Sequence, residues 1–265
     1  MKGATAIGVL RLAAAATGVA ALIGRFFYGQ GFITFSVGNY LGYLTHQTNI
    51  AAVLMFAAGG VTMLRGIREP GWASAARMLI TSYLVVAGIV FGLLAAQAAE
   101  RDYRLDVPWS DQLLHFWIPG FALADWLLSP GRHRVPWRFS YLVLLYPLIW
   151  GAVTMVRGSI VGWYPYFFLD PGQLSSIGEF ATYSSLALAL FAAAATTLNL
   201  GSRVILPIGA NLAKTRRRPA LRVSATHAVE SPPPLATLTP VTPVTPVTNR
   251  SPEAAGDAGR DTSRR

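Results

Sequence analysis

The sequence predicts an all-α protein that crosses a membrane several times. Hydrophobic residues make up 53% of the 265 positions and charged residues 13%, whereas charged residues reach about 25% in an ordinary soluble domain. The mean hydropathy of +0.43 agrees with this contrast. Because the apolar residues form runs close to the roughly 20 residues that a spanning helix needs, we expect a polytopic membrane protein with about six transmembrane helices.

Six apolar runs give the predicted spans of a membrane domain covering residues 1–205. They extend approximately over residues 4–24, 40–64, 77–96, 111–128, 141–156 and 178–200. The first run contains Arg11, which is costly in mid-membrane unless its side chain reaches an interface or faces polar partners. We expect an interface for Arg11, and likewise for Asp125 in the fourth run. A cleaved signal peptide is an alternative for the first run, since Lys2 and Arg11 precede an Ala-rich core.

The distribution of Lys and Arg favours one orientation of these spans. Cytoplasmic loops of membrane proteins carry an excess of basic residues, and here the loops after the second and fourth runs and the segment after the sixth are rich in them. We therefore expect both termini in the cytoplasm and a location in the plasma membrane. The formal charge of +10 fits this topology better than a nucleic-acid partner.

From residue 206 to residue 265 the composition is that of a disordered cytoplasmic tail. A basic segment, KTRRRPALRVS, precedes a stretch rich in Pro, Thr and Ser with a repeated TPV triplet. Such a segment has too few large apolar residues to form a core, and the repeat favours polyproline II. We expect the tail to contact anionic lipid through its basic segment, or to bind a cytoplasmic protein.

The chain has no Cys, which excludes disulfides, thiolate metal sites and a Cys nucleophile. Its His residues offer little else for a metal, because His133 and His227 lie outside the predicted spans. Haem held between His46 and His115 is the one cofactor alternative. Otherwise we expect no metal and no cofactor.

The start of the second run, YLTHQTN at residues 43–49, is unusually polar for a membrane segment. Thr45, Thr48 and Asn49 share one face of a helix, whereas His46 and Gln47 point in other directions. The shared face should turn inward, because polar groups are unfavourable against lipid. Hydrogen bonding between helices, or from Thr hydroxyls to carbonyls of the preceding turn, is the alternative explanation.

Two further segments carry polar groups at the ends of predicted spans. The fourth run begins DQLLHFWIP, in which Asp111 precedes His115 by one turn and Pro119 follows it by another. A kink at the proline can aim the His side chain into a cavity. The fifth run ends at Arg157 and continues into an aromatic loop, WYPYFFLD, which suits the headgroup level of a membrane. Asp170 at the end of this loop is a candidate partner for Arg157 or for a polar headgroup.

The predicted topology gathers these groups at one leaflet. Successive spans alternate in direction, so Thr45, His115 and Arg157 are all expected near the extracytoplasmic leaflet. Their positions in the sequence would not suggest this, since more than 100 residues separate the first from the last.

Three motifs carry a resemblance to a known family. YLTHQTN, LLHFWIP and VRGSIVGWYPYFFLD together resemble the bacterial Pr6Pr membrane proteins, which are distantly similar to the eukaryotic androgen-induced and FAR-17a family. The resemblance covers residues 5–200. Eukaryotic members are intramembrane hydrolases that cleave fatty acid esters of hydroxy fatty acids with a Thr nucleophile and a His on another helix.

Carried over to this chain, the resemblance implies Thr45 as nucleophile and His115 as base. Bacterial relatives usually read FTIQSN at the first motif, so His46 and Thr48 depart from the pattern, and Thr48 becomes a second candidate nucleophile. The chemistry is compatible, because a Thr hydroxyl attacks once a base takes its proton, and Asp111 could orient that base.

The remaining candidates would bind the substrate or donate to a developing oxyanion. Gln47, Asn49 and Arg157 are the expected oxyanion donors. The full set of expected substrate-binding residues is Gln47, Thr48, Asn49, Asp111, Arg157, Trp163, Tyr164 and Asp170.

Three function classes stay open on the sequence. The first is a hydrolase of lipid esters, which would enter sideways from the bilayer. The second is a non-catalytic transporter, lipid-binding protein or scaffold. Within this class a transporter is disfavoured, because the sequence has no internal repeat. The third is a haem protein.

Overall fold

The computed structural model describes residues 2–100, 106–129 and 132–203. The predicted tail lies outside these residues. The elements in chain order are α1 (Lys2–Gly29), α2 (Val37–Gly42), α3 (Leu44–Leu64), α4 (Gly71–Glu100), α5 (Trp109–Gln112), the π-helix η1 (Leu113–Trp117), α6 (Ile118–Leu128), α7 (Arg138–Leu142), α8 (Leu145–Val161), the 3₁₀ turn η2 (Phe167–Leu169) and α9 (Ile177–Gly201).

The predicted fold class is confirmed, since all regular structure in the described ranges is helical. Five segments are long and apolar enough to span a membrane: Gly3–Gly29, Leu44–Leu64, Gly71–Ala96, Arg138–Val161 and Ile177–Gly201. The expected fourth span is also helical, but it consists of α5, η1 and α6 in direct succession. None of these three reaches spanning length alone, so the described residues contain five uninterrupted candidate spans, whereas six were expected.

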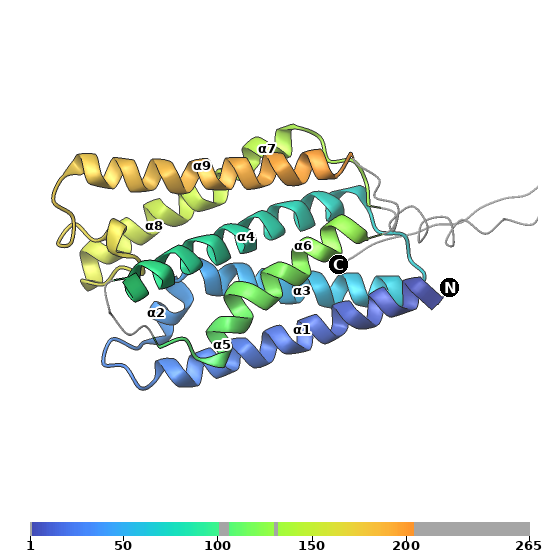
Figure 1. Cartoon of the computed structure of the whole chain (residues 1–265), viewed down its shortest axis with the longest axis horizontal. Coiled ribbons are helices and arrows are strands. Elements are labelled where there is room, and N and C mark those ends of the chain that lie inside the picture. The colour runs from blue at the N-terminus through green and yellow to red at the C-terminus, as the bar shows by residue number, and fades with distance from the viewer. Residues whose placement is uncertain (1, 101–105, 130–131, 204–265) are drawn as a thin grey trace, which may run out of the picture. The chain divides into compact units, whose positions relative to one another are not determined.

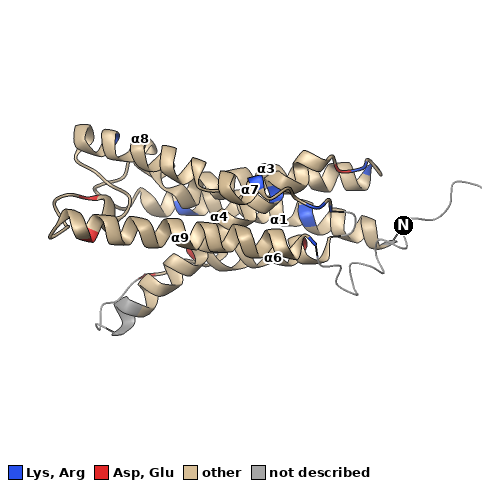
Figure 2. Ribbon diagram, turned by 90° about the horizontal axis from the view of Figure 1, so that it is seen from above, with Lys and Arg blue, Asp and Glu red and all other residues tan. Residues whose placement is uncertain are grey.

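The long helices run back and forth along a common direction, so their ends gather at two ends of the helical bundle (Figure 1). We call the end where α1 finishes and α3 begins the Thr45 end, and the end where α1 begins the Arg11 end. Charged residues lie toward the ends of α8 and α9, and long uncharged stretches separate them (Figure 2). This distribution suits helices surrounded by lipid, where charge is costly.

Small residues bring α1 and α3 into close contact. A Cβ atom added at Gly60 would lie 2.9 Å from the carbonyl oxygen of Gly8, and one at Gly18 would lie 2.6 Å from the side chain of Val53. Without such atoms the two backbones can approach, which is the usual packing device of membrane helices.

The central helix is α4, which contacts α3, α6 and α9. Leu84 faces the apolar cluster shared with α1, α3 and α6, and Tyr83 faces a second cluster shared with α8 and α9. Tyr83 also donates a hydrogen bond of 3.0 Å to the carbonyl of Val143, just before α8. α4 therefore joins the α1–α3–α6 side of the bundle to the α8–α9 side.

Candidate functional site

Part of the polar motif YLTHQTN supplies hydrogen-bond donors at the break between α2 and α3. Tyr43 is extended (φ −69°, ψ 128°) and separates α2 from α3, which leaves the last carbonyls of α2 without helical donors. Three side chains donate to these carbonyls in order: His46 through Nδ1 at 2.5 Å, Gln47 through Nε2 at 2.7 Å and Trp150 of α8 through Nε1 at 3.0 Å. Two of the motif's polar residues are thus occupied by local structure.

Thr48 and Asn49 are also engaged with backbone groups. The Thr48 hydroxyl donates to the Thr45 carbonyl at 3.1 Å, and the Asn49 amide donates to that same carbonyl at 2.9 Å. The Asn49 amide also reaches the Leu114 carbonyl at 3.2 Å. Bonding within and between helices therefore explains four of the motif's five polar residues, and the Thr45 hydroxyl remains.

His115 lies in the π-helix η1, and Pro119 gives the physical reason for that helix. Pro lacks an N–H group, and its ring collides with the carbonyl four residues earlier in an α-helix, here that of His115. The wider turn of a π-helix relieves this collision, and such turns often occur at functional sites. The His115 carbonyl points toward α4, where a Cβ atom added at Gly88 would lie only 2.4 Å from its oxygen.

Thr45 and His115 line the same cavity, which has a volume of about 380 Å³. Its walls come from α3, α4, η1, α8, η2 and α9, and most of them are apolar. Ser184 on α9 adds one further hydroxyl to the lining, and its oxygen is buried without a hydrogen bond. A largely apolar cavity of this size with a few polar groups is typical of a small-molecule site.

The hydrogen bonding of His115 leaves one ring nitrogen free to act as a base. Nδ1 lies 3.0 Å from the carbonyl oxygen of Asp111. A carbonyl can only accept, so Nδ1 carries a proton, and in the neutral imidazole Nε2 keeps its lone pair. The imidazole is also stacked on Phe91, with ring centroids 3.9 Å apart, so its orientation is fixed from two sides.

Asp111 holds His115 through its main chain and uses its carboxylate elsewhere. The carboxylate pairs with Arg25 Nε at 2.9 Å, whereas it lies 4.0 Å from His115 Nδ1. The sequence suggested that the Asp111 side chain would orient the imidazole. In the structure the shorter contact to the imidazole is made by the Asp111 carbonyl.

Tyr166, which the sequence analysis did not select, is the side chain bonded to Thr45. The two hydroxyl oxygens lie 3.4 Å apart, and both residues line the cavity. α8 ends at Gly162, whose left-handed conformation (φ 66°) turns the chain toward this position. Burial raises the pKa of Tyr166 to about 12, so its hydroxyl stays protonated and can donate.

The expected oxyanion donors lie away from the cavity. Gln47 donates to α2 and accepts a hydrogen bond from Tyr146, and the Asn49 amide is committed to two carbonyls. Arg157 donates to Asn39 Oδ1 at 2.6 Å. None of the three expected donors lines the cavity.

The aromatic loop after α8 has mainly structural contacts. Trp163 lies under the Arg157 guanidinium, 5.4 Å from its ring centroid, and the Tyr164 ring covers Gly158 so closely that a Cβ there would lie 2.0 Å from a ring carbon. Asp170 accepts hydrogen bonds from Gly172 N and from Gln173 Nε2. Asp170 therefore closes a turn and does not pair with Arg157.

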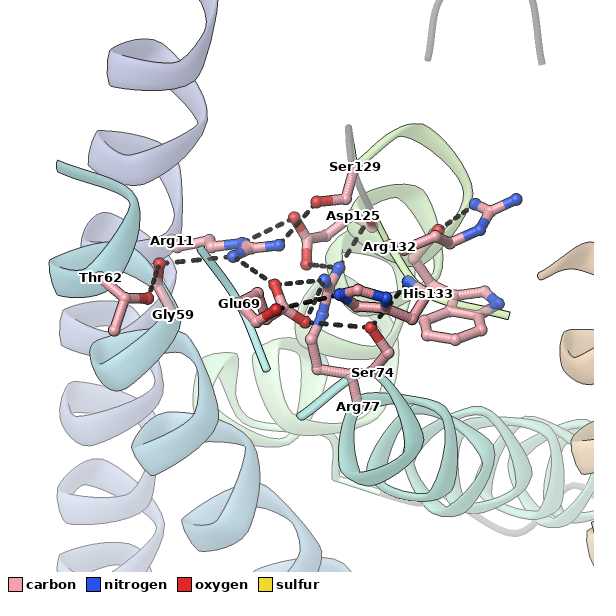
Figure 3. A network of polar contacts seen from close by, with 11 residues as sticks. Arg11, Gly59, Thr62, Glu69, Ser74, Arg77, Asp125, Ser129, Arg132 and His133 are labelled. Atoms are coloured by element: carbon pink, nitrogen blue, oxygen red, sulfur yellow. Dashed lines mark hydrogen bonds and ion pairs between the residues drawn. The ribbon is translucent and has the colours of Figure 1, made fainter. Parts of the chain in front are cut away.

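A buried charge network at the Arg11 end was also missed by the sequence analysis (Figure 3). Arg11 and Asp125, both expected at an interface, are 1% and 8% exposed. Arg11 Nε pairs with Asp125 Oδ1 at 2.9 Å, and Arg11 Nη2 donates to Ser129 at 2.7 Å. Arg11 therefore faces polar partners inside the bundle, which is the other way to accommodate an Arg in a spanning helix.

Two more charges complete this network. Arg77 Nη2 pairs with the second oxygen of Asp125 at 2.7 Å, and Arg77 Nη1 lies 3.0 Å from both carboxylate oxygens of Glu69. Arg11 Nη1 is 3.6 Å from Glu69. Two guanidiniums and two carboxylates thus alternate and cancel, and they join α1, α4 and α6 to the segment before α4.

Within the described ranges, His, Asp and Glu side chains do not form a group of three that could hold a metal ion. His46 and His115 each use Nδ1 for a carbonyl, so each could offer only Nε2 to any ligand. Comparison with known proteins adds no identity: no family model, no curated protein and no solved structure matches this chain.

Proposed function

We propose that this multi-pass membrane protein hydrolyses esters of membrane lipids, with Thr45 as nucleophile and His115 as general base. The observation that carries the proposal is the shared cavity, in which a hydroxyl and a neutral imidazole with a free Nε2 meet a largely apolar wall. The apolar wall suits an acyl chain. The distant similarity to the eukaryotic androgen-induced and FAR-17a family, on which the Thr and His roles rest, implies the same pair of residues.

The proposed reaction follows from the groups at the cavity wall. His115 Nε2 takes the proton of the Thr45 hydroxyl, whose oxygen attacks the ester carbonyl carbon and forms a tetrahedral oxyanion. When the oxyanion collapses, the alcohol leaves with the proton from His115. Water, deprotonated by the same imidazole, then releases the fatty acid from Thr45 and restores the hydroxyl.

One source of oxyanion stabilisation lies beside Thr45. The Tyr166 hydroxyl is a protonated donor at 3.4 Å. Thr45 also sits in the first turn of α3, where Tyr43 provides no side-chain cap. The backbone N–H groups of Leu44 and Thr45 lack helical acceptors there and interact with the Tyr166 hydroxyl oxygen, which they hold beside Thr45. With both termini in the cytoplasm of a plasma-membrane protein, this site would act on the outer leaflet.

The test is labelling of membranes with a fluorophosphonate probe at matched expression. Labelling is expected in the wild type, lost in Thr45→Ala and reduced about 100-fold or more in His115→Ala. Thr48→Ala is the matched control, because Thr48 is buried and its hydroxyl serves a backbone carbonyl. A wild type that is folded and unlabelled would contradict the proposal.

A second candidate function is binding of a lipid without chemistry. It is favoured by the hydroxyl contact of Thr45, whose hydrogen-bond partner among the described residues is Tyr166 and not His115. In that case the cavity would hold an acyl chain, and saturable lipid binding would persist in Thr45→Ala with no labelling of any variant.

Tyr166→Phe separates these two functions further. The Phe ring keeps the contacts with Trp150 and Phe168, but the donor is lost, so the labelling rate should fall about 100-fold. Tyr164→Phe is the control, since Tyr164 lies outside the cavity lining and should label normally. Equal rates for Tyr166→Phe and wild type, measured on protein of equal thermal stability, would remove Tyr166 from the mechanism.

A further inference from the structure

A second cavity, with a volume of about 210 Å³, lies at the Thr45 end between α1, α2 and α3. Its lining differs in kind from that of the first cavity, since it includes a guanidinium, several hydroxyls and aromatic rings. The polar and aromatic lining includes Arg25, Thr34, Asn39, Tyr43, His46 and Trp163. Tyr43 and His46 flank Leu44 and Thr45 in the sequence, so one turn of chain serves both cavities.

Arg25 has an unused hydrogen-bond donor at this cavity. Its Nε pairs with Asp111 at 2.9 Å, whereas its Nη1 is buried and has no hydrogen-bond partner. A buried guanidinium N–H without an acceptor is unfavourable. Arg25 lines the cavity, but Nη1 itself is closed off from it, so a ligand oxygen would reach this N–H after a small rotation of the guanidinium.

Among the described residues, Arg25 is the charged residue that lines this cavity. The carboxylates nearest to Arg25 belong to Asp111, which binds its Nε, and Asp106, which accepts a hydrogen bond from Tyr28 at 2.7 Å, and neither lines the cavity. A second guanidinium, Arg157, lies behind the lining. It bonds to Asn39 and lies over Trp163, and it forms no ion pair with any described carboxylate.

We infer that this second cavity binds the anionic group, a phosphate or a carboxylate, of a membrane amphiphile. Arg25 provides the charge-assisted hydrogen bond. Tyr43, whose hydroxyl forms no hydrogen bond with any described residue, offers a second donor, and Trp163 gives the aromatic wall typical of the headgroup level. The inference does not depend on the hydrolase proposal, because Thr45 and His115 line the other cavity.

The test uses the full chain with Thr45→Ala, so that no probe is turned over. Binding to protein in neutral detergent is compared for dioctanoyl phosphatidate and dioctanoylglycerol, which differ only in the phosphate. Decanoate and inorganic phosphate are the other probes. We expect saturable binding of phosphatidate and much weaker binding of dioctanoylglycerol. Inorganic phosphate that competes fully would indicate a free anion as the ligand, whereas its failure to compete would indicate a lipid headgroup.

Two variants and one control address the site. Arg25→Gln with Asp111→Asn removes the ion pair as a neutral unit, and the affinity for phosphatidate should fall about 10-fold. Arg157→Gln breaks no ion pair and removes a positive charge that lies behind the cavity lining. Binding should therefore weaken about threefold. Arg68→Gln removes the same charge from the exposed Arg11 end and should change nothing.

Two results would overturn the inference. One is equal binding of dioctanoylglycerol and phosphatidate. The other is wild-type affinity in the paired Arg25 and Asp111 variant or, if that variant does not fold, in Arg157→Gln.

Discussion

Replacing Arg11 by Met or Asp125 by Leu is expected to lower the free energy of unfolding by about 3 to 5 kcal/mol. Each change leaves the buried network with one uncompensated charge. Without Arg11, Arg77 alone faces the carboxylates of Asp125 and Glu69. Without Asp125, two guanidiniums share Glu69, which reaches Arg11 only at 3.6 Å.

The double variant Arg11→Met with Asp125→Leu is expected to be far less damaging than the sum of the two. It leaves Arg77 and Glu69 as a neutral pair with both oxygens at 3.0 Å from one guanidinium nitrogen. It also places apolar side chains where two charges were desolvated, which is often neutral or favourable. A coupling of several kcal/mol is therefore expected between the two sites.

Unfolding in mixed micelles, with helix content followed by circular dichroism, measures the three variants against the wild type. Arg68→Gln serves as the control, because Arg68 is exposed at the same end and forms no ion pair with a described residue. Strict additivity of the two single effects, or single effects as small as that of Arg68→Gln, would show that these charges do not act as a network.

The fold class followed from the sequence because an apolar run of spanning length has few possible structures other than a membrane-spanning helix. The run at residues 111–128 has that length too, but its continuity depends on one residue. Pro119 removes a donor and displaces the carbonyl of His115, so the segment forms three short helices in succession. A kink at Pro119 was expected. The π-helix depends on its neighbours, here the Asn49 amide that donates to the Leu114 carbonyl and the close approach of α4 at Gly88.

The candidate site was predictable in part for the same kind of reason. Alternating span directions brought Thr45 and His115 to one end, and the structure puts both on one cavity wall. The role of Tyr166 was not visible, because its loop reads as an aromatic anchor and only the turn at Gly162 brings its hydroxyl to Thr45. The polar motif itself was ambiguous, since the same side chains can serve a substrate or a broken backbone.

The charge network could not have been predicted from composition. Arg11, Glu69, Arg77 and Asp125 are spread over 115 positions, and each one taken alone fits the end of a span. A signal was nevertheless present, because successive spans alternate in direction. The starts of the first and third spans and the end of the fourth span therefore lie at the same side of the membrane. Two Arg and two acidic residues at one depth could have been paired on that basis.

Gly88→Ala is expected to lower both stability and fluorophosphonate labelling, because Gly88 is the point where α4 meets the π-helix. The added Cβ would lie 2.4 Å from the carbonyl oxygen of His115, which is a backbone atom and cannot rotate away. Overpacking of this kind costs about 1 to 3 kcal/mol. Relief requires α4 and η1 to separate. This movement would displace the His115 imidazole from the Thr45 side of the cavity.

Two other glycines give matched controls on the same helices. A Cβ added at Gly92, one turn further along α4, would have an ordinary contact of 3.7 Å with Phe116, and one at Gly120 in α6 would meet nothing within 4 Å. Because Ala is favoured over Gly in a helix by about 1 kcal/mol, Gly92→Ala and Gly120→Ala should be neutral or slightly stabilising. Thermal stability and labelling rate are compared for the three variants. Unchanged labelling of Gly88→Ala would mean that the position of His115 does not limit the reaction. Another group would then have to be proposed as the general base.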